Sequence, residues 1–180
     1  MLRYVQVRFP RPFGARVYVH WSALLVMSVM FVVSLRNPFL AAITICSYFS
    51  IIYLHEAGHA YFAKRLGYRP LAIYIGFLHG RCDYDAPGNP KHAAIVAWGG
   101  VVAQLVVAIP LIVLGQNTSL SEVPGLGPVV VFLGYFSAAI AIVNLAPSSA
   151  LDGGKAWRLV PILWAECRKA TRTPQSLRVC

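Results

Sequence analysis

The sequence predicts an all-α polytopic membrane protein with about four transmembrane helices, a short β-hairpin or strand after the second helix, and an interfacial C-terminal helix. Three observations lead to this prediction. Hydrophobic residues make up 58% of the chain and charged residues only 12%, whereas soluble domains are roughly half apolar and about a quarter charged. The apolar residues gather in four long segments, and the basic residues gather between them. We therefore expect one membrane-embedded domain over residues 1–170, followed by a poorly ordered tail at 171–180.

The four apolar segments cover residues 20–35, 39–66, 93–114 and 127–145. A helix needs ~20 residues to cross the hydrocarbon core of a bilayer, so the last three segments are long enough. The first segment is shorter and must tilt or extend upstream. It follows a long, arginine-rich leader and precedes no small-x-small cleavage site, so we expect a retained span and not a signal peptide.

The basic residues predict the orientation of the chain. Of the sixteen lysines and arginines, fifteen lie before residue 20, between residues 64 and 91, or after residue 150. With four spans these regions share one face, which the positive-inside rule makes cytoplasmic. Both termini are therefore expected in the cytoplasm, and the membrane is expected to be a bacterial inner membrane. Nucleic-acid binding needs a basic face on a soluble fold, so the net charge of +10 does not predict a nucleic-acid partner.

The connection after the second segment contains an apolar run at residues 69–78 that is too short to cross the membrane. Within it, Leu71, Ile73 and Ile75 alternate with Ala72 and Tyr74, so both faces are apolar. This pattern predicts a strand or hairpin lying against the membrane or within the bundle. A loose interfacial loop is the alternative.

Near the C-terminus, apolar and basic residues alternate in a helical pattern. Trp157, Leu163 and Trp164 are set against Lys155 and Arg158. Such a segment is typical of an amphipathic helix at a membrane surface. It is not expected to form a fifth span.

The most specific motif is HEAGH at residues 55–59, inside the second apolar segment. On a helix, residues four apart project from one face, so His55 and His59 can bind one metal ion. Glu56 would then lie beside a water molecule at the metal and could act as its general base. Ionisable groups at this depth in a membrane are costly. The four cysteines form no C-x-x-C pair, so neither a disulfide framework nor a cysteine zinc site is indicated.

Catalytic zinc usually has three protein ligands, and the residues alone leave the third one open. Glu122 lies at the wrong end of its neighbouring spans, and Asp83 and Asp85 lie in a polar turn where they are better explained as solvated. Asp152 ends the stretch NLAPSSALD that follows the fourth segment, where Pro147 interrupts the helix. From spacing alone, a helix cap or a loop position is the favoured interpretation of Asp152.

Together, HExxH at 55–59 and NxxPxxxLDG at 144–153 resemble, in the same order, the motifs of the site-2 protease family of intramembrane zinc metalloproteases. The resemblance covers about residues 21–158 and implies a minimal metalloprotease domain, without a PDZ or CBS insertion. It implies one Zn²⁺ per chain, held by His55, His59 and Asp152, with Glu56 as the catalytic base. Asn144 would lie near the site, where it could contact the substrate or kink the helix.

By this resemblance, the expected function is hydrolysis of peptide bonds in or near the transmembrane segments of membrane-anchored proteins, within the lipid bilayer. An unwound substrate is expected to add as a strand to residues 71–78, so Ile73 and Ile75 would shape the site. A catalytically silent scaffold of the same fold is the alternative. A metal transporter is less consistent, because its metal-binding groups would line a path across the membrane.

The sequence departs from the family pattern at residues 98–104. Family members often carry a Gly-Pro-x-x-Asn-like element there, whereas this chain reads WGGVVAQ. Gln104 retains an amide that could serve in packing. We assign it no chemistry from the sequence.

Overall fold

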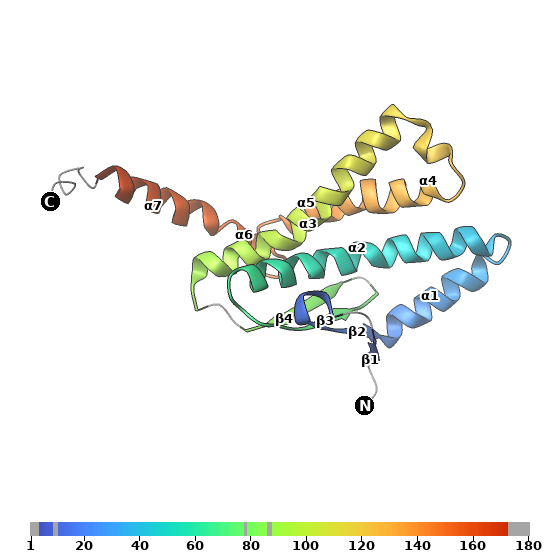
Figure 1. Ribbon diagram of the computed structural model, residues 1–180, viewed down its shortest axis with the longest axis horizontal. Coiled ribbons are helices and arrows are strands. Elements are labelled where there is room, and N and C mark those ends of the chain that lie inside the picture. The colour runs from blue at the N-terminus through green and yellow to red at the C-terminus, as the bar shows by residue number, and fades with distance from the viewer. Residues whose placement is uncertain (1–3, 9–10, 78, 86–87, 173–180) are drawn as a thin grey trace.

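The computed structural model describes residues 4–8, 11–77, 79–85 and 88–172. These residues form a helical bundle with a small sheet beside it (Figure 1). Three helical stretches within them are long and apolar enough to cross a membrane: α2 (Pro38–Arg65), α3 (Pro90–Asn117) and the continuous stretch Leu126–Asn144. That stretch comprises α4 (Leu126–Val129), the π-helical segment η3 (Val130–Phe136) and α5 (Ser137–Asn144). The prediction of an integral membrane protein built mainly from apolar helices is confirmed.

The first apolar segment forms α1 (Trp21–Val33), a helix of 13 residues. At 1.5 Å per residue it is ~20 Å long, which is less than the ~30 Å of the hydrocarbon core. Its first turn is capped by His20, whose Nδ1 accepts a hydrogen bond from the Ser22 backbone N–H at 3.2 Å. Upstream of His20 the chain continues as a β-strand. Three of the described helices are therefore long enough to span, and the predicted count of about four stays a prediction.

The sheet contains four strands in the spatial order β1 (Tyr4–Val7), β2 (Arg16–His20), β3 (Pro70–Ile75) and β4 (Gly80–Tyr84). The pairs β1–β2 and β3–β4 are antiparallel, whereas β2 and β3 are parallel. Short 3-10 turns lie at η1 (Pro12–Gly14) and η2 (Ser119–Glu122). The hairpin β3–β4 agrees with the strand predicted after the second helix, although Leu78 in its turn lies outside the described residues. Strands β1 and β2 were not predicted from the sequence.

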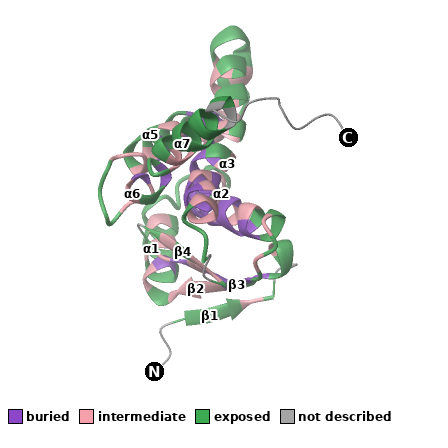
Figure 2. Ribbon diagram, turned by 90° about the vertical axis from the view of Figure 1, so that its left-hand side faces the viewer, coloured by how far each residue is buried: buried purple, intermediate pink, exposed green. Residues whose placement is uncertain are grey.

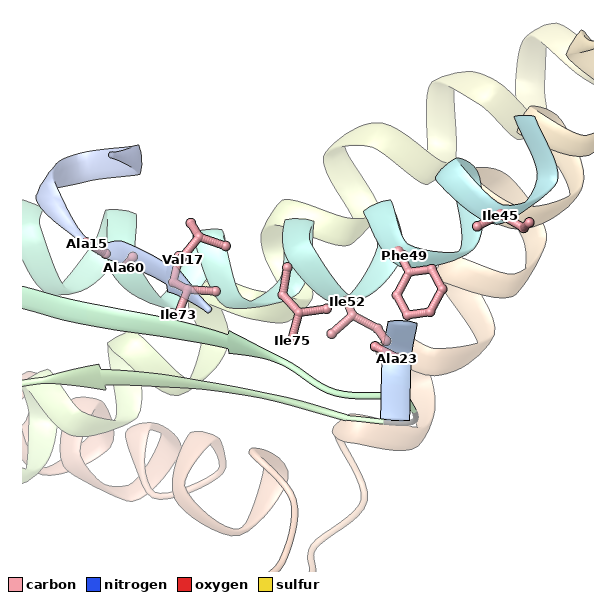
Figure 3. Packing of buried hydrophobic residues seen from close by; sticks show 9 residues of the cluster. All are labelled: Ala15, Val17, Ala23, Ile45, Phe49, Ile52, Ala60, Ile73 and Ile75. Carbon is pink, nitrogen blue, oxygen red and sulfur yellow. The ribbon is translucent and has the colours of Figure 1, made fainter. Parts of the chain in front are cut away.

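The main apolar core joins the sheet to α2. Val17 of β2 and Ile73 and Ile75 of β3 pack in one cluster with Ile52 and Ala60 of α2 (Figure 3). Burial concentrates on α2 (Figure 2), because this helix contacts the sheet on one side and α3 on the other. Helix α2 is therefore packed on two sides, and this packing restricts the positions of the side chains that it carries.

The backbones of α2 and α3 approach each other closely at Gly58 and Gly99. A Cβ atom added at Gly99 would lie only 2.8 Å from the Gly58 carbonyl oxygen, and one added at Gly58 would lie 2.7 Å from Ala103 Cβ. Small residues allow such close packing of membrane helices. The contact brings the polar C-terminal part of α2 against the first half of α3.

After α5 the chain forms α6 (Gly153–Ala156) and α7 (Leu159–Arg172). Helix α7 extends away from the bundle (Figure 1), and an ion pair of 2.5 Å between Lys91 Nζ and Glu166 Oε2 joins it to the start of α3. Leu163 and Trp164 are exposed on α7. An amphipathic C-terminal helix is thus present, and its position at the membrane surface stays a prediction. The predicted tail begins inside α7, and its residues 173–180 lie outside the described part.

Candidate metal centre

Helix α2 presents two imidazoles at one point of the bundle. His55 and His59 lie one helical turn apart and are 8% and 7% exposed. Their Nε2 atoms are 3.1 Å apart. The four-residue spacing therefore does bring both rings together on one face of the helix.

Asp152 reaches the same point from the end of the fourth apolar segment. Its Oδ2 lies 2.8 Å from His55 Nε2 and 3.1 Å from His59 Nε2. Burial alone would raise the pKa of the Asp152 carboxyl, but its hydrogen bonds to the two imidazoles outweigh burial and hold that pKa well below its ordinary value. The structure thus places an ionised carboxylate beside two ring nitrogens that lie 97 and 93 residues away in the chain.

The loop that delivers Asp152 depends on glycine. A Cβ added at Gly153 would collide with the backbone of Leu145 and Ala146, and one added at Gly154 would collide with the backbone of Ser148. The loop therefore folds tightly back between α5 and α6. This compact turn explains how an aspartate eight residues past Asn144 reaches the bundle interior.

These three atoms fit the ligand set of a catalytic zinc ion. Tetrahedral zinc with ligands at about 2.0–2.1 Å separates its ligand atoms by ~3.3 Å, and the three separations here are 2.8, 3.1 and 3.1 Å. Two imidazoles and one carboxylate are a known donor set for catalytic zinc. Among the described residues, His55, His59 and Asp152 form the one such cluster that could hold a metal ion.

The opposite nitrogen of each imidazole is also engaged. His55 Nδ1 lies 2.9 Å from Gln104 Oε1, and His59 Nδ1 lies 2.8 Å from the Val96 carbonyl oxygen. A carbonyl oxygen only accepts, so each Nδ1 must donate its hydrogen. Such contacts orient metal-binding histidines and leave Nε2 for the metal.

Glu56 lies beside this cluster, at the wall of a cavity of about 590 Å³. The residue is 5% exposed. A Cβ added at Gly80 would lie 2.5 Å from Glu56 Cγ and 2.6 Å from Oε1, so the absence of a side chain on β4 makes room for this carboxylate. The cavity volume falls in the range of ligand pockets, about 300–1,000 Å³.

The other candidate ligands stay apart from the cluster. Asp83 forms a bidentate pair with Arg81, with both N–O distances at 2.9 Å, and Glu122 lies in η2. Cys82 lines the cavity, but burial, followed by the negative charges of Glu56 and Asp83, raises the pKa of its thiol to about 12. None of these three residues belongs to the cluster of described residues that could hold a metal ion.

Asn144 lines the cavity at the end of α5, as the motif spacing predicted.

Ile73 and Ile75 do not line the cavity. They are 0% and 8% exposed in the core, and β3 pairs with β2 on one side and β4 on the other. The expectation that a substrate strand adds to residues 71–78 is therefore wrong for β3, because both of its edges are already paired. Among the described strands, β4 carries the edge that remains open next to the cavity.

Three residues around the metal cluster were not assigned to it from the sequence. Gln104 contacts His55, Gly80 makes room for Glu56, and Gly100 lies against both imidazoles. The sequence offered one indication of this role: Gln104 is a polar amide inside an apolar segment, four residues after Gly100.

No family model matches the chain. A candidate zinc metalloprotease of Synechocystis sp. is 32% identical over 126 residues, which cover 69% of this chain and 32% of that protein. The chain thus spans about a third of the length of this relative. The site-2 protease of Methanocaldococcus jannaschii has the same fold, with a TM-score of 0.67 at 21% identity over 87% of this chain and 71% of that one. The chain therefore has the fold of a site-2 protease and is similar over about two thirds of its own length to a candidate zinc metalloprotease.

Proposed function

We propose that the chain is an intramembrane zinc metalloprotease that hydrolyses peptide bonds in or near transmembrane segments of membrane-anchored proteins. The observation that carries this proposal is the triangle of His55 Nε2, His59 Nε2 and Asp152 Oδ2, with sides of 2.8–3.1 Å, beside Glu56 in one cavity. The proposed localisation is the inner membrane. Both termini are proposed to be cytoplasmic, because the basic regions would share that face and β2, just before α1, pairs with β3, just after α2.

The proposed site lies below the membrane surface. His59 and His55 lie six and ten residues before α2 ends at Arg65, which corresponds to ~9 and ~15 Å along the helix. Water must reach this depth for hydrolysis. The cavity provides a route, because it is lined by polar side chains at the metal cluster and by Arg81 and Lys155.

In the proposed mechanism His55, His59 and Asp152 hold one zinc ion. When bound, zinc polarises the scissile carbonyl and lowers the pKa of the attacking water to roughly 7. Glu56 takes the proton from this water and delivers it to the leaving amine. Asn144, which lines the cavity, is proposed to donate an amide hydrogen to a substrate carbonyl.

The direct test is metal-dependent cleavage. Purified chain in detergent is incubated with a peptide that contains one transmembrane helix, and products are identified by mass spectrometry. We expect cleavage that stops when a chelator removes zinc and returns when stoichiometric zinc is added. Zinc binding without cleavage of any tested membrane helix would instead support the silent scaffold, and absence of zinc binding would contradict the proposed protease.

We further propose that an unwound substrate pairs with the open edge of β4. In the hairpin, Gly76 N–H donates to the His79 carbonyl oxygen at 3.0 Å. Residues of an antiparallel strand direct their backbone groups alternately toward and away from the partner. The backbone N–H of Cys82, three residues after His79, therefore faces away from β3 and toward a substrate.

This proposal predicts that Cys82→Pro lowers kcat/KM by about 2- to 10-fold, because proline removes one backbone donor worth a single net hydrogen bond. Zinc content should be unchanged. Cys82→Ala is the matched control, since it removes the same thiol and keeps the N–H. Equal kcat/KM for the proline and alanine variants would contradict pairing at this edge.

A further inference from the structure

We propose that Gln104 is a positioning residue that fixes the ring of His55 and thereby sets the zinc affinity of the site. This inference rests on the proposed function only in that zinc is taken to occupy His55, His59 and Asp152. It assigns a role to a cavity-lining side chain that contacts the ring of a proposed ligand without being a ligand itself.

If His55 binds a metal through Nε2, the hydrogen bond between His55 and Gln104 must run from the imidazole ring to the amide oxygen. For His55 Nε2 to offer its lone pair to a metal, Nδ1 of the same ring must carry the hydrogen. That hydrogen needs an acceptor, and Gln104 Oε1 lies 2.9 Å from Nδ1. The carboxamide oxygen of Gln104 must therefore face the ring. If its NH₂ group faced the ring, Nδ1 would accept a hydrogen bond, and the neutral ring would carry its own hydrogen on Nε2.

This orientation leaves Gln104 Nε2 with no hydrogen-bond partner among the described residues, and the side chain is 0% exposed. A buried amide N–H without a partner is destabilising, and lipid offers no water to replace the partner. An apolar side chain of the same length would avoid this penalty. The presence of glutamine is explained if its oxygen is needed by His55.

The face of α3 that meets α2 is arranged around the two imidazoles. Val96, Gly100 and Gln104 are four residues apart, so they lie along one side of the helix. The Val96 carbonyl accepts from His59, and Gly100 leaves room for both rings. His59 is thus oriented by backbone that no substitution removes, whereas His55 is oriented by a side chain. Zinc affinity should respond to Gln104 for this reason.

The test compares three variants of the full chain in detergent. Gln104→Met keeps an unbranched side chain and removes the acceptor, whereas Gln104→Glu keeps an acceptor oxygen. Gln116→Met is the matched control, because Gln116 lies on the same helix with its amide on the Tyr135 hydroxyl at 3.2 Å. Zinc affinity is measured by competition with a chelator, and ligand geometry is measured from the absorption spectrum of the Co²⁺-loaded chain.

We expect Gln104→Met to weaken zinc binding about 10- to 100-fold, as loss of such a partner does in other zinc sites, and to alter the Co²⁺ spectrum. Gln104→Glu and Gln116→Met should bind zinc like the wild type. The metal-free melting temperature of Gln104→Met should not fall, because the substitution also removes the unpaired amide. A residue that served packing alone would lower that temperature.

Three results would overturn the inference: wild-type zinc affinity in Gln104→Met, binding by Gln104→Glu as weak as in Gln104→Met, or weaker binding matched by loss of metal-free stability. Should Gln104→Met fail to fold, Gln104→Leu takes its place and the Gln104→Glu result still decides. Equal zinc affinity in the wild type and in Gln104→Met would reject this inference and leave the proposed function standing. A wild-type chain that binds no zinc rejects the proposed function as well.

Discussion

Replacing Glu56 with glutamine should lower the rate of peptide hydrolysis by about 10²- to 10⁴-fold, the range that a positioned general base contributes. The amide has nearly the same shape and cannot accept the proton of the attacking water. Glu56 is adjacent to the metal cluster without being part of it, so the zinc content of the purified variant should equal that of the wild type. Turnover of a membrane-helix peptide and metal analysis of the same sample measure both quantities.

Glu166→Gln provides the matched control for this substitution. Glu166 pairs with Lys91 on the exposed helix α7, far along the chain from the cavity, so its amide should leave turnover near the wild-type value. Equal turnover in Glu56→Gln and wild type would contradict the proposed mechanism. Loss of zinc in Glu56→Gln would instead show that this carboxylate helps to hold the metal.

Gly100→Ala should remove most zinc binding, by about 100-fold or more, because metal ligands tolerate displacements of only about 0.2 Å. The added Cβ would lie 2.6 Å from His55 Cε1 and 2.7 Å from His59 Nε2, closer than real Cβ contacts allow. Both rings are buried and cannot swing into solvent. Zinc affinity from chelator competition measures the effect, and turnover should fall with it.

Gly88→Ala is the control for the added methyl group, since nothing lies within 4 Å of a Cβ at Gly88 and its backbone is not left-handed. It should bind zinc normally. Normal zinc affinity in Gly100→Ala would mean that α3 shifts freely away from α2, against the close packing at Gly58 and Gly99.

Local pattern was sufficient to predict the long helices. Hydropathy marked α2, α3 and the Leu126–Asn144 stretch within a few residues of their ends. Asn37 and Asn89 cap α2 and α3 just before prolines, as helix starts often do. Spacing on one helix likewise predicted that the rings of the HExxH motif converge.

Contacts between segments that lie far apart in the sequence could not be predicted from local pattern. Strand β2 carries only the short alternation Val17-Tyr18-Val19 inside an arginine-rich leader, and its partner β3 lies more than fifty residues later. Because β3 acquires this second neighbour, the edge expected at Ile73 and Ile75 is closed. The meeting of Gln104 with His55 likewise depends on the α2–α3 crossing, which neither helix specifies alone.

The glycine contact between α2 and α3 has a consequence for how a substrate enters. The two backbones approach each other so closely at Gly58 and Gly99 that we expect these two helices to move as one rigid pair. A lateral gate for an incoming transmembrane helix must then open elsewhere. The flank between the β4 edge and α5 borders the cavity directly. We expect separation to occur there while the proposed zinc ligands on α2 stay in place.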